Sequence, residues 1–194
     1  MSPGDSGYTI GTSGQIKMVT DQPEFDPEQR IQILPGVTDD RWLYMGAVLS
    51  GGASLEWVKN ALRIEEDYEQ LLKRVRSSSS PGASGMVFLP YLRGERAPHM
   101  DSKARGAFVG LRAEHQWQDL IRSVLEGVCF AFADCRKILA ELKYKPDELV
   151  ASGAGGMNPF WQEIMASVQN AKIYEASNRS SAVYGAALLA SVSC

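Results

Sequence analysis

The sequence predicts an α/β fold, and three observations carry this prediction. Strand-like and helix-like segments alternate over residues 148–192, which is typical of α/β proteins. Glycine-rich turns stand where predicted strands pass into predicted helices. The chain has 194 residues, of which 44% are hydrophobic and 22% charged, close to the averages of globular domains. We therefore expect one domain over residues 1–194 with a buried core.

A β-hairpin is expected near the start of the chain. Residues 7–20, GYTIGTSGQIKMVT, alternate β-forming residues around the tetrad GTSG, whose glycines favour a tight turn. A polar, proline-broken loop follows over residues 21–30. Residues 41–49 then predict a strand, and two glycines lead from it into a helix within residues 50–62.

Two more helices and a loop are predicted in the middle of the chain. Residues 65–75 predict a short helix, and RSSSSPGASG at 76–85 predicts a surface loop because serine, proline and glycine dominate it. From Gln116 to Leu142 apolar residues recur with the 3.6-residue period of a helix that has one buried face. Pro146 ends that helix, since the residue before a proline is biased away from helical geometry.

The last third of the chain predicts a strand, a helix, a strand and a helix. These are expected over residues 148–153, 158–170, 171–177 and 181–192. The four tryptophans are expected in the core or in helix packing: Trp42, Trp57, Trp117 and Trp161.

Charge and cysteine content exclude several classes of protein. The net charge is -3 and no basic run appears, so nucleic acid is not an expected partner.

Neither a signal peptide nor a run of about 18 apolar residues is present, so we expect a cytoplasmic protein without a membrane partner. Cys129, Cys135 and Cys194 lack the spacing of a zinc site and are expected as reduced thiols. His99 and His115 are too few for a metal centre or a hydrolytic triad.

A glycine cluster lies between an apolar strand and an apolar helix in ASGAGGMNPFWQEIM, residues 151–165. A strand that ends in glycines and opens into a helix presents backbone N–H groups and the positive end of the helix dipole, which suit a phosphate. The same corner can serve only to turn the chain, since it is neither a P-loop nor a G-x-G-x-x-G motif. The tetrad GTSG at 11–14 has the same two interpretations, because its hydroxyls and amides could hold phosphate oxygens.

The segment GERAPHMDSKARG at 94–106 is dense in charge. A solvated loop held together by ion pairs is the simpler interpretation. Long, specified loops are also where functional residues concentrate, so both interpretations stay open. The charged residues are Glu95, Arg96, Asp101, Lys103 and Arg105.

Residues 106–127, GAFVGLRAEHQWQDLIRSVLEG, resemble the C-terminal signature of the FGGY family of carbohydrate kinases. FLPYLRGERAP resembles the family segment just upstream, TIGTSG its second phosphate motif and GAGGMNPFWQE its adenosine motif. The order and spacing of these motifs agree with the family pattern over nearly the whole chain. The matching signature positions are Gly106, Phe108, Gly110, Leu111, Asp119, Leu120, Ser123, Val124, Leu125 and Glu126.

This resemblance implies a ribonuclease H-like ATPase domain of the actin, heat-shock protein and sugar kinase superfamily, with a mixed sheet flanked by helices. It implies the C-terminal, nucleotide-binding half of a kinase whose sugar-binding N-terminal domain lies outside residues 1–194. Such a kinase uses ATP and Mg²⁺ and transfers the γ-phosphate to a hydroxyl of a sugar or sugar acid. TIGTSG, GERAP and SSAVYGAAL are most similar to gluconate kinases and LSGGASLEW to xylulose kinases, so both substrates stay open.

The resemblance also implies which residues contact the nucleotide. The GTSG turn is expected to face the β- and γ-phosphates, and the GAGG corner to line the adenosine and α-phosphate. Ala154 stands where many relatives carry another glycine, and Glu56 lies in a segment that can reach the nucleotide in relatives. No protein ligand to a metal is implied. The expected nucleotide-binding residues are Thr12, Ser13, Gly14, Gly153, Gly155, Gly156 and Asn158.

In relatives the catalytic aspartate precedes the GTSG turn in a short glycine-aspartate motif, and this chain begins too late to contain it. Asp5 lies too near the turn for that role. The isolated chain is therefore expected to be inactive. The alternative is a truncated, non-catalytic actin-like domain that acts as a protein-interaction module. A surface that the N-terminal domain covers in relatives would be exposed, which predicts a homodimer or poor solubility.

Overall fold

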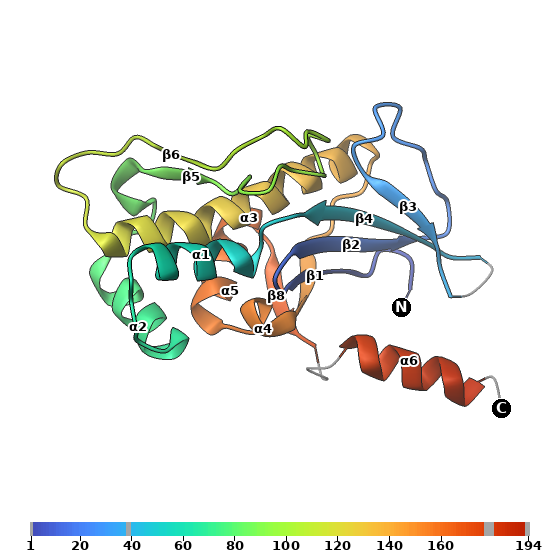
Figure 1. Ribbon diagram of the computed structural model, residues 1–194. Coiled ribbons are helices and arrows are strands. Elements are labelled where there is room, and N and C mark those ends of the chain that lie inside the picture. The colour runs from blue at the N-terminus through green and yellow to red at the C-terminus, as the bar shows by residue number, and fades with distance from the viewer. Residues whose placement is uncertain (1, 38–39, 177–180, 193–194) are drawn as a thin grey trace.

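The computed structural model describes residues 2–37, 40–176 and 181–192 and has the predicted α/β architecture (Figure 1). In this part of the chain the main sheet has six strands in the order β3-β4-β2-β1-β7-β8. The pairs β3–β4, β4–β2 and β2–β1 are antiparallel, whereas β1–β7 and β7–β8 are parallel, so the sheet is mixed as expected. The strands are β1 (Ser6–Ile10), β2 (Gly14–Thr20), β3 (Gln32–Pro35), β4 (Trp42–Val48), β7 (Glu148–Ser152) and β8 (Lys172–Glu175).

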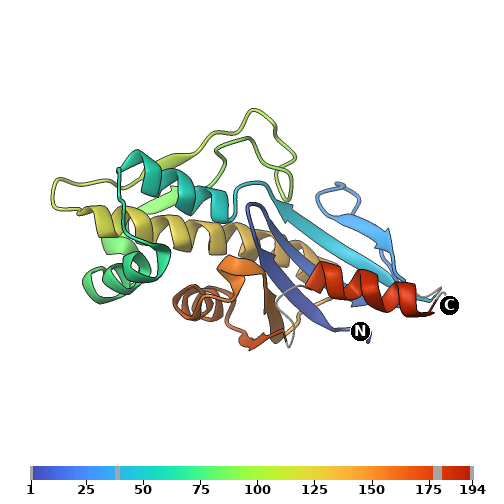
Figure 2. The same ribbon diagram turned by 60° about the horizontal axis from the view of Figure 1, so that its bottom comes forward.

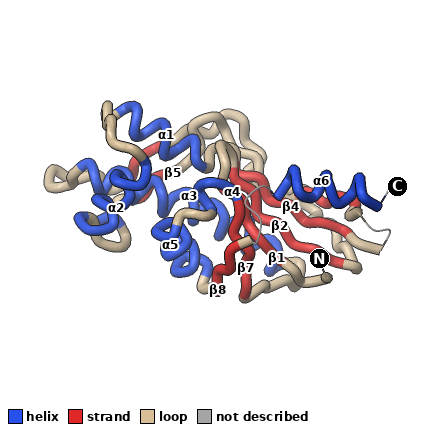
Figure 3. The backbone as a smooth tube through the Cα atoms, turned by 90° about the horizontal axis from the view of Figure 1, so that it is seen from below, coloured by secondary structure: helices blue, strands red, loops and turns tan. Residues whose placement is uncertain are grey.

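The long helix α3 (Trp117–Glu141) connects the two ends of the molecule (Figures 1 and 2). At one end it contacts α1, α2 and the small sheet β5–β6, and at the other it contacts β2 and β4. Figure 3 shows α4 and α5 beside β7 and β8. The remaining elements are α1 (Gly52–Ala61), α2 (Tyr68–Ser78), a 3-10 turn (Ala83–Gly85), β5 (Val87–Leu89), β6 (Ala107–Val109), α4 (Gly153–Gly156), α5 (Pro159–Gln169) and α6 (Ser181–Val192).

Two glycines let α3 lie close against the sheet. A Cβ on Gly14 would lie 2.5 Å from Cζ of Phe132, and a Cβ on Gly46 would lie 2.8 Å from Cβ of Cys135. Phe132 and Cys135 are fully buried, like most of the apolar residues that the helical period predicts. Burial of one large apolar side chain contributes about 1.5–3 kcal/mol, so this seam is a main source of stability.

The element boundaries differ from the prediction in the first half of the chain. The sequence does not predict β3, a four-residue edge strand with no buried residue. The loop predicted from residue 76 is wrong for residues 76–78, because α2 continues to Ser78. Two hydrogen bonds fix Ser79 at that end: its carbonyl accepts from the Arg122 guanidinium at 2.6 Å, and its hydroxyl donates to Asp119 at 2.6 Å.

Cys129 and Cys135 are free and buried, as expected of reduced thiols, whereas Cys194 lies outside the described residues. Trp161 is buried, but Trp57 is 41% exposed and stacks with Phe88 at a centroid distance of 5.8 Å. None of the helices in the described part of the chain combines the length and apolar character needed to cross a bilayer.

Candidate functional site

Three glycine-containing corners meet at one end of the main sheet. The first is the β1–β2 turn at residues 11–13, the second is Gly51–Gly52, where α1 begins after β4, and the third is Gly153–Gly156, which forms α4 directly after β7. β1 pairs antiparallel with β2 and parallel with β7, so the ends of β1 and β7 lie side by side here. The fold therefore brings together two glycine turns that are far apart in the sequence.

The first two corners are joined backbone to backbone. The N–H of Gly52 donates to the carbonyl of Gly11 at 2.7 Å, and the N–H of Ala53 donates to the carbonyl of Thr12 at 3.0 Å. A Cβ on Gly52 would lie 2.5 Å from the Gly11 carbonyl oxygen, so this approach requires glycine. These two amides at the start of α1 hold the turn and are already occupied.

The third corner also leaves backbone where a side chain would not fit. Gly153 adopts φ +78°, and a Cβ there would lie 2.6 Å from the carbonyl oxygen of Ile10. A Cβ on Gly155 would lie 2.6 Å from Cγ2 of Ile10 and 2.9 Å from Cζ3 of Trp161. Asn158 then caps α5 by accepting the N–H of Trp161 at 3.1 Å. Ala154 is exposed in this corner, Gly153 and Gly155 are partly exposed, and Gly156 is buried.

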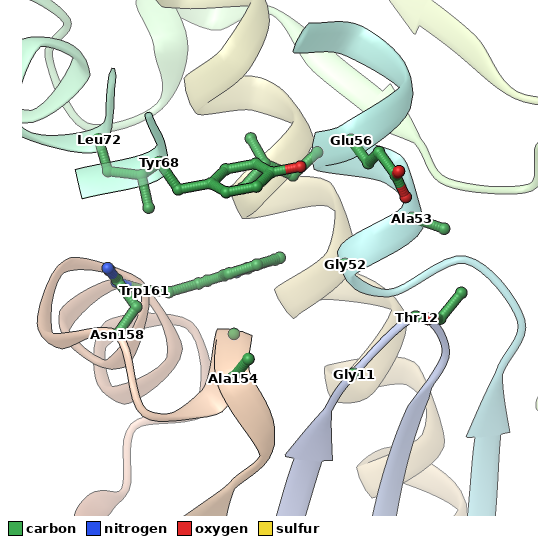
Figure 4. Close-up of a pocket in the computed structure, with 12 residues that line it drawn as sticks. Gly11, Thr12, Gly52, Ala53, Glu56, Tyr68, Leu72, Ala154, Asn158 and Trp161 are labelled. Atoms are coloured by element: carbon green, nitrogen blue, oxygen red, sulfur yellow. The ribbon is translucent and has the colours of Figure 1, made fainter. Parts of the chain in front are cut away.

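A cavity of about 430 Å³ lies between these corners (Figure 4). Figure 4 shows the Tyr68 ring extending from α2 toward α1, with its hydroxyl on the side of Glu56, and the Trp161 ring on the side of the third corner. The volume is in the range of about 300–1,000 Å³ that small-molecule sites occupy. The lining residues are Gly11, Thr12, Gly52, Ala53, Leu55, Glu56, Tyr68, Leu72, Ala154, Gly155, Asn158 and Trp161.

Few polar groups face this cavity. The indole N–H of Trp161 donates to the carbonyl of Leu125 at 3.1 Å, so its hydrogen bond is made inside the core. Burial and the Glu56 carboxylate raise the pKa of Tyr68. A second hollow of about 750 Å³ shares Tyr68 and three other lining residues with the first, and it adds the basic Lys73 and Arg76.

The structure separates the seven predicted nucleotide-binding residues into two groups. Thr12, Gly155 and Asn158 line the cavity, and Gly153 lines the adjoining hollow. Three others line neither hollow: Ser13, Gly14 and Gly156. Gly14 lies against Phe132, and a Cβ on Gly156 would be 3.4 Å from the ring of Tyr8. Their contact with a nucleotide stays a prediction.

Two other expectations concern acidic residues. Glu56 lines the cavity, and its contact with a nucleotide stays a prediction. Asp5 lies at the opposite end of β1, where its carboxylate accepts the N–H of Ser2 at 2.6 Å.

The sequence reasoning missed the α2 wall of the cavity. Tyr68 and Leu72 are four residues apart, so they share one face of the helix. That spacing was a usable signal, because an aromatic and an apolar residue four positions apart predict one apolar face on the helix. What the sequence does not give is the docking of this face against the glycine corners.

The 94–106 loop differs from the simpler of its two interpretations. No ion pair in the described ranges uses its charged residues, so the expectation of a loop held by ion pairs is wrong. Glu95 is instead buried, and its Oε1 accepts the N–H of Leu49 at 2.9 Å and that of Arg96 at 2.8 Å. Burial raises the pKa of this carboxyl, and the two backbone hydrogen bonds oppose that effect.

Comparison with known proteins agrees with the fold. The profile described as "FGGY family of carbohydrate kinases, C-terminal domain" matches residues 7–194. A xylulose kinase from Staphylococcus epidermidis is 32% identical over 94% of this chain, and a gluconokinase from Bacillus subtilis is 31% identical over 96% of it. The solved structure of a ligand-bound xylulose kinase from Lactobacillus acidophilus superposes with a TM-score of 0.84 at 32% identity over 91% of the chain.

The chain is much shorter than the proteins that it resembles. It spans 36% of the Staphylococcus kinase, 38% of the Bacillus kinase and 36% of the Lactobacillus structure. The glycine corners and the cavity lie inside the matched region.

Proposed function

Because this chain belongs to the FGGY family of carbohydrate kinases and matches its C-terminal domain, we propose that it is the nucleotide-binding half of an ATP-dependent, cytoplasmic kinase. The full-length enzyme would transfer the γ-phosphate of ATP to a hydroxyl of a sugar or sugar acid, with xylulose and gluconate as the candidates. The observation that carries the proposal is the meeting of the GTSG turn and the GAGG corner at one cavity.

The residues of the cavity fit a nucleotide. The faces of Tyr68, Leu72 and Trp161 suit a base, because small-molecule sites are mainly apolar and aromatic. The hydroxyl of Thr12 and the backbone amides of the third corner suit phosphate oxygens, whereas the amides of Gly52 and Ala53 already donate to carbonyls of the first corner. The residues proposed to contact the nucleotide or shape its site are Thr12, Ser13, Gly14, Gly153, Gly155, Gly156 and Asn158.

In this proposal, two domains contribute different parts of the active site. Phosphoryl transfer depends on holding the nucleophile, the γ-phosphate and the metal in line, and Mg²⁺ neutralises phosphate charge when it is bound. We propose that the catalytic aspartate and most of the sugar site belong to an N-terminal domain. The isolated 194-residue chain is then expected to bind nucleotide without phosphorylating xylulose or gluconate.

The test is a calorimetric titration of the purified chain with Mg·ATP, repeated on two matched variants. Ala154→Glu places a carboxylate at an exposed position that lines both hollows, where it repels phosphate. Ala113→Glu makes the same change at an exposed position that lines neither hollow. We expect weak binding by the unmodified chain and by Ala113→Glu, and a loss of at least about tenfold, or ~1.4 kcal/mol, in Ala154→Glu.

The outcomes separate this proposal from the interaction-module alternative. Equal affinity in the two variants would place the nucleotide elsewhere on the chain. No binding by a well-folded chain would contradict the proposal that this half holds the nucleotide by itself. The interaction-module alternative would then gain support from α6, where Val183 is 73% exposed and Tyr184 50%.

A further inference from the structure

The 94–106 loop takes the place of a strand at the edge of β4. β3 pairs with β4 only over Trp42–Met45, and beyond that point the loop makes the edge contacts. The carbonyl of Ala47 accepts the N–H of Ala97 at 3.0 Å, and the N–H of Leu49 donates to Glu95 Oε1 at 2.9 Å. The carboxylate of Glu95 therefore supplies the acceptor that a neighbouring strand would supply through a carbonyl.

Burying the Glu95 carboxylate to accept this hydrogen bond has a high desolvation cost. Its side chain is only 2% exposed, and its second oxygen, Oε2, is buried with no hydrogen-bond partner among the described residues. A neutral acceptor could receive the same N–H at a lower desolvation cost. What the carboxylate adds is a stronger, charge-assisted hydrogen bond, which fixes Leu49 more firmly than a neutral acceptor would.

Leu49 lies two residues before the second glycine corner, with Ser50 between them. Gly51 and Gly52 follow it, and the amides of Gly52 and Ala53 hold the carbonyls of Gly11 and Thr12. The approach leaves no free space, since a Cβ on Gly51 would lie 2.7 Å from the carbonyl carbon of Ser13. A shift of Leu49 is therefore passed through tightly packed backbone to the turn at the cavity.

We propose that Glu95 is a positioning residue for the candidate nucleotide site: its carboxylate fixes Leu49 and thereby sets the position of the Thr12 turn through Gly51 and Gly52. The effect on nucleotide binding rests on the proposed function, whereas the effect on the turn does not.

The first measurement is amide hydrogen exchange by NMR on the 194-residue chain. In Glu95→Ala the Leu49 N–H loses its acceptor, and we expect exchange at Leu49, Gly52 and Ala53 to quicken about tenfold or more. Exchange at Ala151, in β7, which pairs with β1 and β8 and not with β4, should stay unchanged. Glu95→Gln keeps a carbonyl acceptor and should restore most of the protection. A uniform rise in exchange at all four amides, or no rise at the first three, would overturn the proposal.

The second measurement is the affinity for Mg·ATP of the same variants, with Asp26→Ala as the control. Asp26 is another buried carboxylate, but it accepts its hydrogen bonds from Arg30 and Glu28, away from the cavity. We expect about tenfold weaker binding in Glu95→Ala, recovery to within about threefold in Glu95→Gln, and no change in Asp26→Ala. Equal weakening by Glu95→Ala and Asp26→Ala would make Glu95 a stability residue only.

The two measurements test different proposals, so a negative result in one does not decide the other. If the unmodified chain binds no Mg·ATP, the proposed function of this half fails. Hydrogen exchange then still decides whether Glu95 positions the turn.

Discussion

The two ends of the main sheet are built from different contacts. At the cavity end, backbone meets backbone at the glycine corners. At the opposite end, side chains make the connections: buried Asp26 accepts from the guanidinium of Arg30, which also reaches Glu141 at 2.7 Å. Nearby, the hydroxyl of Tyr44 accepts the N–H of Glu24 at 2.6 Å and donates to its carbonyl at 2.7 Å.

The difference indicates that one end of the sheet is suited to ligand binding and the other end to stabilising the fold. The third glycine corner gives a ligand access to backbone amides, and a side chain added at Gly51, Gly52, Gly153 or Gly155 would not fit. The side-chain network at the far end ties β2, β4 and the end of α3 together around a small core of its own. We therefore expect changes at the cavity end to alter nucleotide binding, and changes at the far end to alter stability alone.

The largest expected effect comes from adding one methyl group at the third corner. Gly153→Ala forces a side chain into φ +78° and within 2.6 Å of the Ile10 carbonyl, so it should cost about 3 kcal/mol of unfolding free energy and abolish detectable Mg·ATP binding. Gly4→Ala is the control at the far end, because Gly4 has φ +91° but nothing within 4 Å of the added Cβ. It should cost about 1 kcal/mol and leave binding unchanged.

Urea unfolding and calorimetric titration measure both quantities. If the two alanine variants lose equal stability, the close approach of Gly153 to β1 contributes nothing beyond its backbone conformation.

A smaller effect, confined to stability, is expected from Asp26→Asn. Hydrogen bonds from the Arg30 side chain hold the pKa of Asp26 below its ordinary value. Because the pKa is lower in the folded state than in the unfolded chain, this stabilisation is complete above about pH 5 and is lost as the pH falls through the folded value. Asp26→Asn should cost about 2 kcal/mol at neutral pH and progressively less in acid.

The measurement is a series of urea midpoints between pH 3 and pH 7, with Mg·ATP affinity determined at pH 7. A stability difference that stays constant across this range would mean that the charge of Asp26 is not what stabilises the far end.

The sequence predicts individual helices and strands better than it predicts which of them lie side by side in the fold. The 25-residue α3 and the β1–β2 hairpin follow from residue periods and turn residues, which act within a few positions. The sequence does not predict β3, because its four partly or fully exposed residues on a sheet edge show no alternation of apolar and polar side chains.

The joint position of the two glycine turns could not be derived in the same way. It depends on the parallel pairing of Tyr8 with Ala151, which brings together segments from opposite ends of the chain. Nothing in either segment specifies its partner, because strand pairing is decided by the whole topology. Family resemblance supplied that information as an implication, and the fold places the two corners at one cavity.

The smallest expected effect tests the α2 wall, which the sequence did not reveal. Tyr68 on α2 and Tyr174 on β8 are equally exposed, at 47% and 48%, but only Tyr68 lines the cavity. Tyr68→Ala should weaken Mg·ATP binding about fivefold, since stacking of one base on an aromatic side chain contributes ~1 kcal/mol or more. Tyr174→Ala should leave affinity unchanged, and each substitution should alter stability by no more than about 0.5 kcal/mol. Calorimetric titration of the pair measures the contrast, and equal affinities would mean that the base does not rest on α2 and that the glycine corners alone form the site.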